Sequence, residues 1–209
     1  MYREAEPRDD EDSGARIARP AEFPVRAAAQ VIDLVFGVAL GMGVGVITGM
    51  ALAVVATNGA LAVGWETRLG RLDVTGVALG MAGSLLYHTL SAWLGGASVG
   101  KWLCGLRVHT AELSLDRTFL RGLHPCTARG ALIRSLAIYV DAMLFGAVAY
   151  FTMINSGTQA RLGDRWARTI VVVAKETRGA QPRSPALGVL AGVAAWAICL
   201  ALPMILRVL

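Results

Sequence analysis

The sequence predicts an all-α membrane protein with about four apolar helices, a charged N-terminal tail and two short extended segments. Of its 209 residues, 55% are hydrophobic and only 17% are charged, whereas soluble domains carry about 25% charged residues. Four apolar runs are long enough to cross a bilayer, which takes about 20 residues. The first 22 residues mix both signs of charge and contain no apolar run, which is typical of a disordered tail.

The first apolar run, residues 25–57, has Asp33 as its only ionisable group after Arg26. We predict a transmembrane helix on which Arg26 and Asp33 share one face about two turns apart. Glycines follow Asp33 at four-residue spacing: Gly37, Gly41, Gly45 and Gly49. Such a row favours close packing against another helix. A carboxylate at this depth usually faces protein or water, so Asp33 is either a functional group or a solvated interface residue.

The second run, residues 74–94, is also predicted to be a transmembrane helix. Small residues again stand four apart and lead to a histidine: Gly76, Gly80, Ser84 and His88. In an antiparallel hairpin of the first two helices, Asp33 and His88 lie at similar depth. They then form a pair that holds or relays a proton, or His88 bonds a carbonyl or water near the interface.

Residues 95–102 (GGASVGKW) nearly match the phosphate-loop pattern GxxxxGK[ST]. We reject that reading because Trp102 replaces the hydroxyl residue and a membrane helix, not a strand, precedes the segment. A glycine-rich elbow at the lipid headgroups fits better, since Lys101 and Arg107 follow. Residues 106–109 and 169–173 are short and are predicted to be extended.

The third apolar run, residues 131–154, contains Arg134 and Asp141 and leaves the topology open. If it crosses, as runs of this length usually do, eleven basic residues lie on the inner side and eight on the outer side. If it re-enters, the distribution becomes sixteen and three, which the positive-inside rule prefers. Re-entry also lets the two extended segments pair on one side of the membrane.

We divide the chain into a disordered tail (1–22), a membrane domain (23–175), a linker (176–185) and a C-terminal transmembrane helix (186–209). The three cysteines form no CxxC pair and fit no zinc pattern, so free thiols are expected. The net charge of +5 indicates cytoplasmic loops and anionic lipid rather than nucleic acid. No nucleophile, metal or cofactor motif survives inspection, so we expect neither an enzyme nor a cofactor.

These residues resemble the RDD family of small bacterial membrane proteins, named for one arginine and two aspartates. Arg26 is similar to the family arginine and Asp33 to the first aspartate. The family segment G-x-[ST]-x-GK…GLRV resembles a set of positions in this chain, namely Gly96, Ser98, Gly100, Lys101, Gly105, Leu106, Arg107 and Val108. The resemblance covers roughly residues 20–175.

The family's closing stretch, D-K-x-A-G-T-x-V-V, resembles residues 164–172. This likeness makes Asp164 the second aspartate, with Asp141 as the rival. Arg165 stands where the family usually has lysine, and Arg168 stands where it usually has glycine before Thr169.

The resemblance implies a multi-pass protein of the bacterial inner membrane. The basic residues on the N-terminal side of the first helix predict a cytoplasmic N-terminus. Some family members are linked to sodium–proton exchange. One hypothesis is therefore an ion-coupled transporter whose Asp33 binds a proton or sodium ion, tuned by Arg26 and His88. The alternative is a non-transporting scaffold that docks a second copy or another membrane protein through its glycine rows. The residues of the coupling or structural cluster are Arg26, Asp33, His88, Asp141 and Asp164.

Overall fold

The computed structural model describes residues 20–55, 74–111, 123–142, 147–156, 159–176 and 184–206. Three helices are long and apolar enough to cross a membrane: α1 (Phe23–Val55), α3 (Val74–Gly95) and α8 (Pro185–Leu206). They match the first, second and last predicted runs to within a few residues. Most of the charged tail and most of the linker 176–185 lie outside the described residues.

The long helices present apolar side chains outward. Met42 and Ile47 of α1 are 68% and 70% exposed, and Leu190 of α8 is 67% exposed. In water such a surface would be unfavourable, whereas in a bilayer acyl chains cover it. The apolar periphery is therefore what a membrane domain requires.

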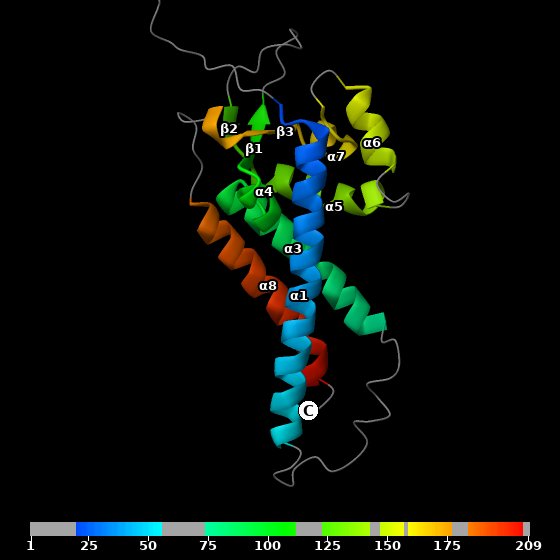
Figure 1. The fold of residues 1–209 in the computed structure, drawn as a ribbon. Helices are drawn as coiled ribbons and strands as arrows, with labels where there is room; N and C mark the ends of the chain where they lie inside the picture. The colour runs from blue at the N-terminus through cyan, green and yellow to red at the C-terminus, as the bar shows by residue number, and fades with distance from the viewer. Residues whose placement is uncertain are drawn as a thin grey trace, which may run out of the picture.

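A three-stranded antiparallel sheet lies at one end of the long helices, next to the labels β1, β2 and β3 in Figure 1. The central strand β1 (Leu106–Ala111) lies between β2 (Leu123–Pro125) and β3 (Thr169–Val173). Both predicted extended segments are confirmed, and they pair with His109 opposite Ile170. β2 falls in a stretch that the sequence marked only as polar. The class is therefore mostly helical with a small sheet, rather than all-α.

Several elements meet at this sheet end. α1 begins there, since the Ala21 N–H donates to the Val171 carbonyl of β3 at 2.8 Å. α3 ends where α8 begins, with Gly95 directly against Pro185 and Gly188. The short helix α4 (Val99–Leu103) follows α3 and leads into β1. α1 and α8 thus run away from the sheet, and α3 runs towards it (Figure 1).

The third apolar run forms two shorter helices, α5 (Ala128–Ala142) and α6 (Ala147–Ile154), instead of one long helix. Neither is among the three candidate spans in the described part of the chain, so the predicted count of four is not confirmed. Gly130 of α5 lies against Ala167 and Thr169, at the start of β3. α6 leads to α7 (Leu162–Trp166), which precedes β3. The run therefore leaves the sheet end and returns to it (Figure 1).

α8 packs along α3 through small residues. Gly192 lies against Tyr87, and Gly83 lies against Trp196. α8 also supplies the neighbours of the predicted glycine rows, because Gly37 meets Trp196 and Gly80 meets Leu200. The rows were expected to pack against another helix, and α8 is that helix at these two positions.

Candidate functional site

Asp33 lies almost three turns into α1 and is only 3% exposed. Its carboxylate accepts hydrogen bonds from the Tyr87 hydroxyl at 3.0 Å, the Ser98 hydroxyl at 2.5 Å and the Gly100 N–H at 2.8 Å. The Lys101 ammonium lies 3.7 Å from the same carboxylate and donates to the Ser98 oxygen at 2.9 Å. Asp33 is therefore surrounded by polar protein groups.

These contacts follow from the free N–H groups in the first turn of α4. A helix leaves its first N–H groups without partners inside the helix. Ser98 is the N-cap residue, but its side chain caps nothing in its own helix. Instead Asp33 of α1 accepts the Gly100 N–H, and the Tyr87 hydroxyl of α3 accepts the Val99 N–H at 2.9 Å. Two long helices thus supply the cap of α4.

Three glycines of the family segment have distinct structural reasons. A Cβ on Gly100 would overlap the carbonyl oxygen of Ala29 and crowd the Asp33 carboxylate. Gly96 and Gly105 have φ angles of 67° and 66°, in the left-handed region where glycine is unstrained. The segment is therefore a tight elbow pressed against α1.

Lys101 is a buried cation beside this carboxylate, with its side chain 12% exposed. Burial lowers the pKa of Lys101 to about 8, although the charge of Asp33 acts in the opposite direction. An amine with this pKa releases its proton much closer to neutral pH than an exposed lysine does.

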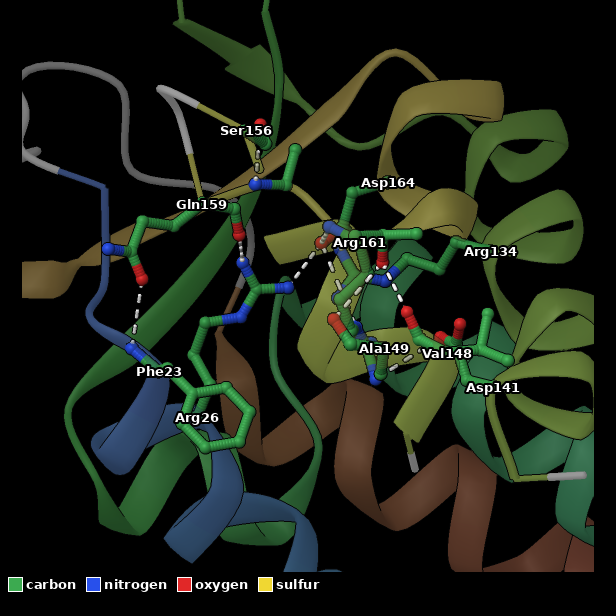
Figure 2. Close-up of polar contacts among 12 residues, drawn as sticks. Phe23, Arg26, Arg134, Asp141, Val148, Ala149, Ser156, Gln159, Arg161 and Asp164 are labelled. Carbon is green, nitrogen blue, oxygen red and sulfur yellow. Dashed lines mark hydrogen bonds and ion pairs between the residues drawn. The ribbon is translucent and has the colours of Figure 1, made fainter. Parts of the chain in front are cut away.

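A second cluster surrounds Asp164 of α7, which is 1% exposed (Figure 2). Arg26 of α1 forms an ion pair with its Oδ2. Arg134 of α5 lies 3.2 Å from Oδ1, and the Arg161 Nε lies 3.8 Å from Oδ2. Burial alone would raise the pKa of Asp164, but the charges of Arg134, Arg26 and Arg161 outweigh it and hold this pKa well below its usual range. Asp164 is therefore a permanent carboxylate.

Arg26 also ties α1 to the segment before α7. Its Nη1 donates to the Gln159 carbonyl at 2.6 Å. The side chain of Gln159 in turn accepts the Phe23 N–H at 3.1 Å, so the first turn of α1 is anchored twice (Figure 2).

The RDD family model matches residues 20–168. The chain belongs to the RDD family. The match extends from three residues before α1 to the residue before β3, so it includes both clusters and excludes α8. Comparison with curated proteins and with solved structures gave no match.

Within the RDD domain, the two rival aspartates occupy different positions. Asp164 contacts the family arginine Arg26 directly. Asp141 lies at the margin, with its Oδ2 3.7 Å from the Arg161 Nη1. The structure therefore gathers Arg26, Asp141 and Asp164 in one cluster and Asp33 in a neighbouring one.

His88 lies beside Tyr87, with ring centroids 4.8 Å apart. It lines a small cavity of about 10 Å³ together with Lys101 and Arg134. The hydrogen bond that α3 gives to Asp33 comes from Tyr87, the preceding residue, and a hydrogen bond between Asp33 and His88 is not among the contacts of the described residues. The sequence feature that could have identified Tyr87 as a partner of Asp33 is its hydroxyl group, because a tyrosine hydroxyl buried in an apolar helix needs a hydrogen-bond partner.

Other positions of the family motif serve the sheet. Arg107 pairs with Val172 across β1 and β3, and its Nη1 donates to the Leu106 carbonyl at 3.0 Å. Thr169 is 5% exposed and begins β3 opposite Thr110. The GLRV and closing T-x-V-V patterns are thus two paired strands.

Proposed function

We propose that this RDD protein exchanges a cation, such as sodium, for a proton at the Asp33–Lys101 pair. The observation that carries the proposal is the geometry of the pair. The Lys101 ammonium is 3.7 Å from the carboxylate, beyond direct hydrogen-bond distance, and bonds Ser98 instead. Hard cations prefer oxygen ligands, and Asp33, Ser98 and Tyr87 supply carboxylate and hydroxyl oxygens at one point.

The exchange conserves charge. Burying a second positive charge beside Lys101 is costly, so entry of a cation favours loss of one proton. The Lys101 ammonium then becomes a neutral amine, its proton leaves to water, and the Asp33 carboxylate pairs with the cation. Return of the proton reverses the step and releases the cation.

The Asp164 cluster is unsuited to the same step. Its partners Arg26, Arg134 and Arg161 are guanidinium groups, which keep their proton in proteins. That cluster instead stabilises the arrangement of α1, α5 and α7. Lysine at position 101 therefore distinguishes the Asp33 pair as the exchange site.

The proposal includes a topology with the sheet end in the cytoplasm and the third run re-entering from that side. All basic residues within the described ranges belong to elements at or near the sheet end: Arg26, Lys101, Arg107, Arg129, Arg134, Arg161, Arg165, Arg168 and Lys175. The positive-inside rule assigns this end to the cytoplasm. A single cysteine at Ser156 should react with an impermeant thiol reagent only from the cytoplasmic side in a background without the native cysteines. Labelling from the outer side would contradict the topology.

The exchange is tested in proteoliposomes with an internal pH dye and an applied sodium gradient. We expect Asp33→Asn and Lys101→Met to abolish the sodium-dependent pH change while both variants still elute as one species in detergent. Lys175→Met removes an exposed lysine from the 3-10 helix Ala174–Glu176 and should behave as wild type. Wild-type exchange in Asp33→Asn would end the proposal.

A second candidate is the non-transporting scaffold. It is favoured by an open stretch of α1, since a Cβ added at Gly41, Gly43 or Gly45 would meet nothing within 4 Å beyond its own helix. A second copy or another membrane protein fits such a surface by small-residue packing. If Gly41→Leu abolishes co-purification of a partner, and the wild type carries no ion flux, the scaffold replaces the exchanger.

A further inference from the structure

A cavity of about 240 Å³ lies beside the beginning of α1, between that helix, α6 and the sheet. Three cationic side chains line it, Arg26, Lys101 and Arg161, and no acidic side chain is among its described lining residues. The rest of the wall is mainly apolar and includes Val31 and Met153. The cavity therefore combines positive charge with an apolar surface.

The charges around this cavity do not balance. The ion pairs of the two clusters join four cations to three carboxylates, namely Arg26, Lys101, Arg134 and Arg161 with Asp33, Asp141 and Asp164. One positive charge is left over in a buried region, where an uncompensated charge is unfavourable. A bound anion would neutralise it.

Arg161 is the cation with the weakest partners. Its ion pairs to Asp141 and Asp164 are 3.7 and 3.8 Å long, beyond hydrogen-bond distance. Its Nε is buried and has no hydrogen-bond partner within the described part of the chain. Buried donors normally have partners, and Arg161 lines the cavity, so this guanidinium has hydrogen-bonding capacity left for a bound acceptor.

We propose that the cavity binds the phosphate of an anionic phospholipid, whose acyl chains lie along the outer face of α1. Arg26 lies in the first turn of a candidate span, which is the depth of the headgroups. Val31 lines the cavity and is also 59% exposed. Leu34 and Val35 continue this outward apolar surface at 66% and 62% exposure. A soluble phosphate has the same charge but makes no use of that surface.

Lys101 lines this cavity and also belongs to the exchange site, but the lipid site can be tested separately because Arg161 takes no part in the proposed exchange. Arg161 is the central residue of the lipid site, and an exchanger without a lipid site or a lipid site without exchange are both physically consistent.

The test measures thermal unfolding of the full chain in a neutral detergent with added lipid. Phosphatidylglycerol should raise Tm in a saturable way, and phosphatidylcholine should not. Arg161→Gln should weaken the phosphatidylglycerol effect about tenfold or more in apparent affinity, as expected for loss of a charge-assisted hydrogen bond. Arg165→Gln is the matched control, since Arg165 is exposed on α7, the helix for which Arg161 is the N-cap residue, and does not line the cavity.

Equal shifts with both lipids, or an unchanged phosphatidylglycerol affinity in Arg161→Gln, would overturn the proposal. Inorganic phosphate or glycerol 3-phosphate giving the same protection without lipid would assign the cavity to a soluble phosphate instead. If Arg161→Gln does not fold, Ala149→Phe fills the cavity from α6 without changing charge. It should remove the lipid-specific shift, and a retained shift would equally overturn the proposal.

Discussion

Arg26 and Asp164 form a buried ion pair although 138 residues separate them in the sequence. Arg26 belongs to the first turn of α1, and Asp164 lies in the middle of α7. The same carboxylate holds Arg134 of α5 at 3.2 Å on its other oxygen. One side chain therefore links three helices beside the sheet, while Asp33 links α1, α3 and α4 in the same way.

Replacing Asp164 should destabilise the fold strongly. In Asp164→Asn, Arg26 and Arg134 remain buried and lose their shared negative partner. We expect the free energy of unfolding in detergent to fall by about 3–5 kcal/mol, the usual range for breaking a buried ion pair. Asp141→Asn is the matched control and should cost less than half as much, because its ion pair to Arg161 is 3.7 Å long. Equal losses in both variants would contradict the linking role of Asp164.

Stability should depend on pH through Lys101. The pKa of Lys101 is about 8 in the folded protein against 10.5 for an unperturbed lysine, because burial disfavours its charge. Between these values the unfolded state binds more protons, so stability rises with pH from about 8 to about 10.5, by at most about 1.4 kcal/mol per pH unit. The charge of Asp33 partly offsets the effect of burial on the pKa of Lys101, and the charges of Arg134 and Arg161 add to it.

The measurement compares unfolding curves of wild type and Lys101→Met across this pH range. The difference between the two proteins isolates Lys101 from tyrosines and other groups that titrate nearby. Parallel curves would show that Lys101 ionises normally in the folded state.

The helices of this fold were largely predictable because length and hydropathy are local properties. α1, α3 and α8 begin and end within a few residues of the apolar runs. The pairing of β1 with β3 was also foreseen as a consequence of re-entry. The division of the third run was not, because its hydropathy fits one long helix. Its arrangement involves the ion pairs that α5 makes with α7, whose residues come later in the chain.

The sequence singled out some residues of the two clusters, but not their partners Tyr87, Arg134 and Arg161. Motif spacing singled out Arg26, Asp33 and Asp164. The seven-residue separation of Arg26 and Asp33 suggested that Arg26 tunes Asp33. In the structure Arg26 pairs with Asp164 instead, and Asp33 lies near Lys101. Both assignments satisfy the same charges. Only the positions of α4 and α7 in the folded protein decide which pairing forms. The depth estimate also could not decide between the neighbouring residues Tyr87 and His88 as the partner of Asp33 on α3.

Replacing Arg168 with glycine should make the folded protein more stable. It follows α7 with a φ of 52°, in the left-handed region that costs an ordinary residue roughly 1 kcal/mol. Its side chain is exposed, so little packing is lost. Arg168→Gly should therefore raise the free energy of unfolding by about 1 kcal/mol. Arg165→Gly, within α7, should instead lower it by about as much. A loss in Arg168→Gly would mean that the arginine side chain makes a stabilising contact.

Gly100→Ala should disturb the exchange site, because the added Cβ would overlap the Ala29 carbonyl and push α4 away from α1. We expect a loss of about 1–3 kcal/mol in unfolding free energy, the usual cost of overpacking, together with reduced sodium-dependent exchange. Gly41→Ala is the matched control, since Gly41 lies in α1 with nothing within 4 Å. Gly41→Ala should be neutral or slightly stabilising. If both variants behave alike, α4 does not approach α1 this closely, and Asp33 and Lys101 lose the geometry on which exchange depends.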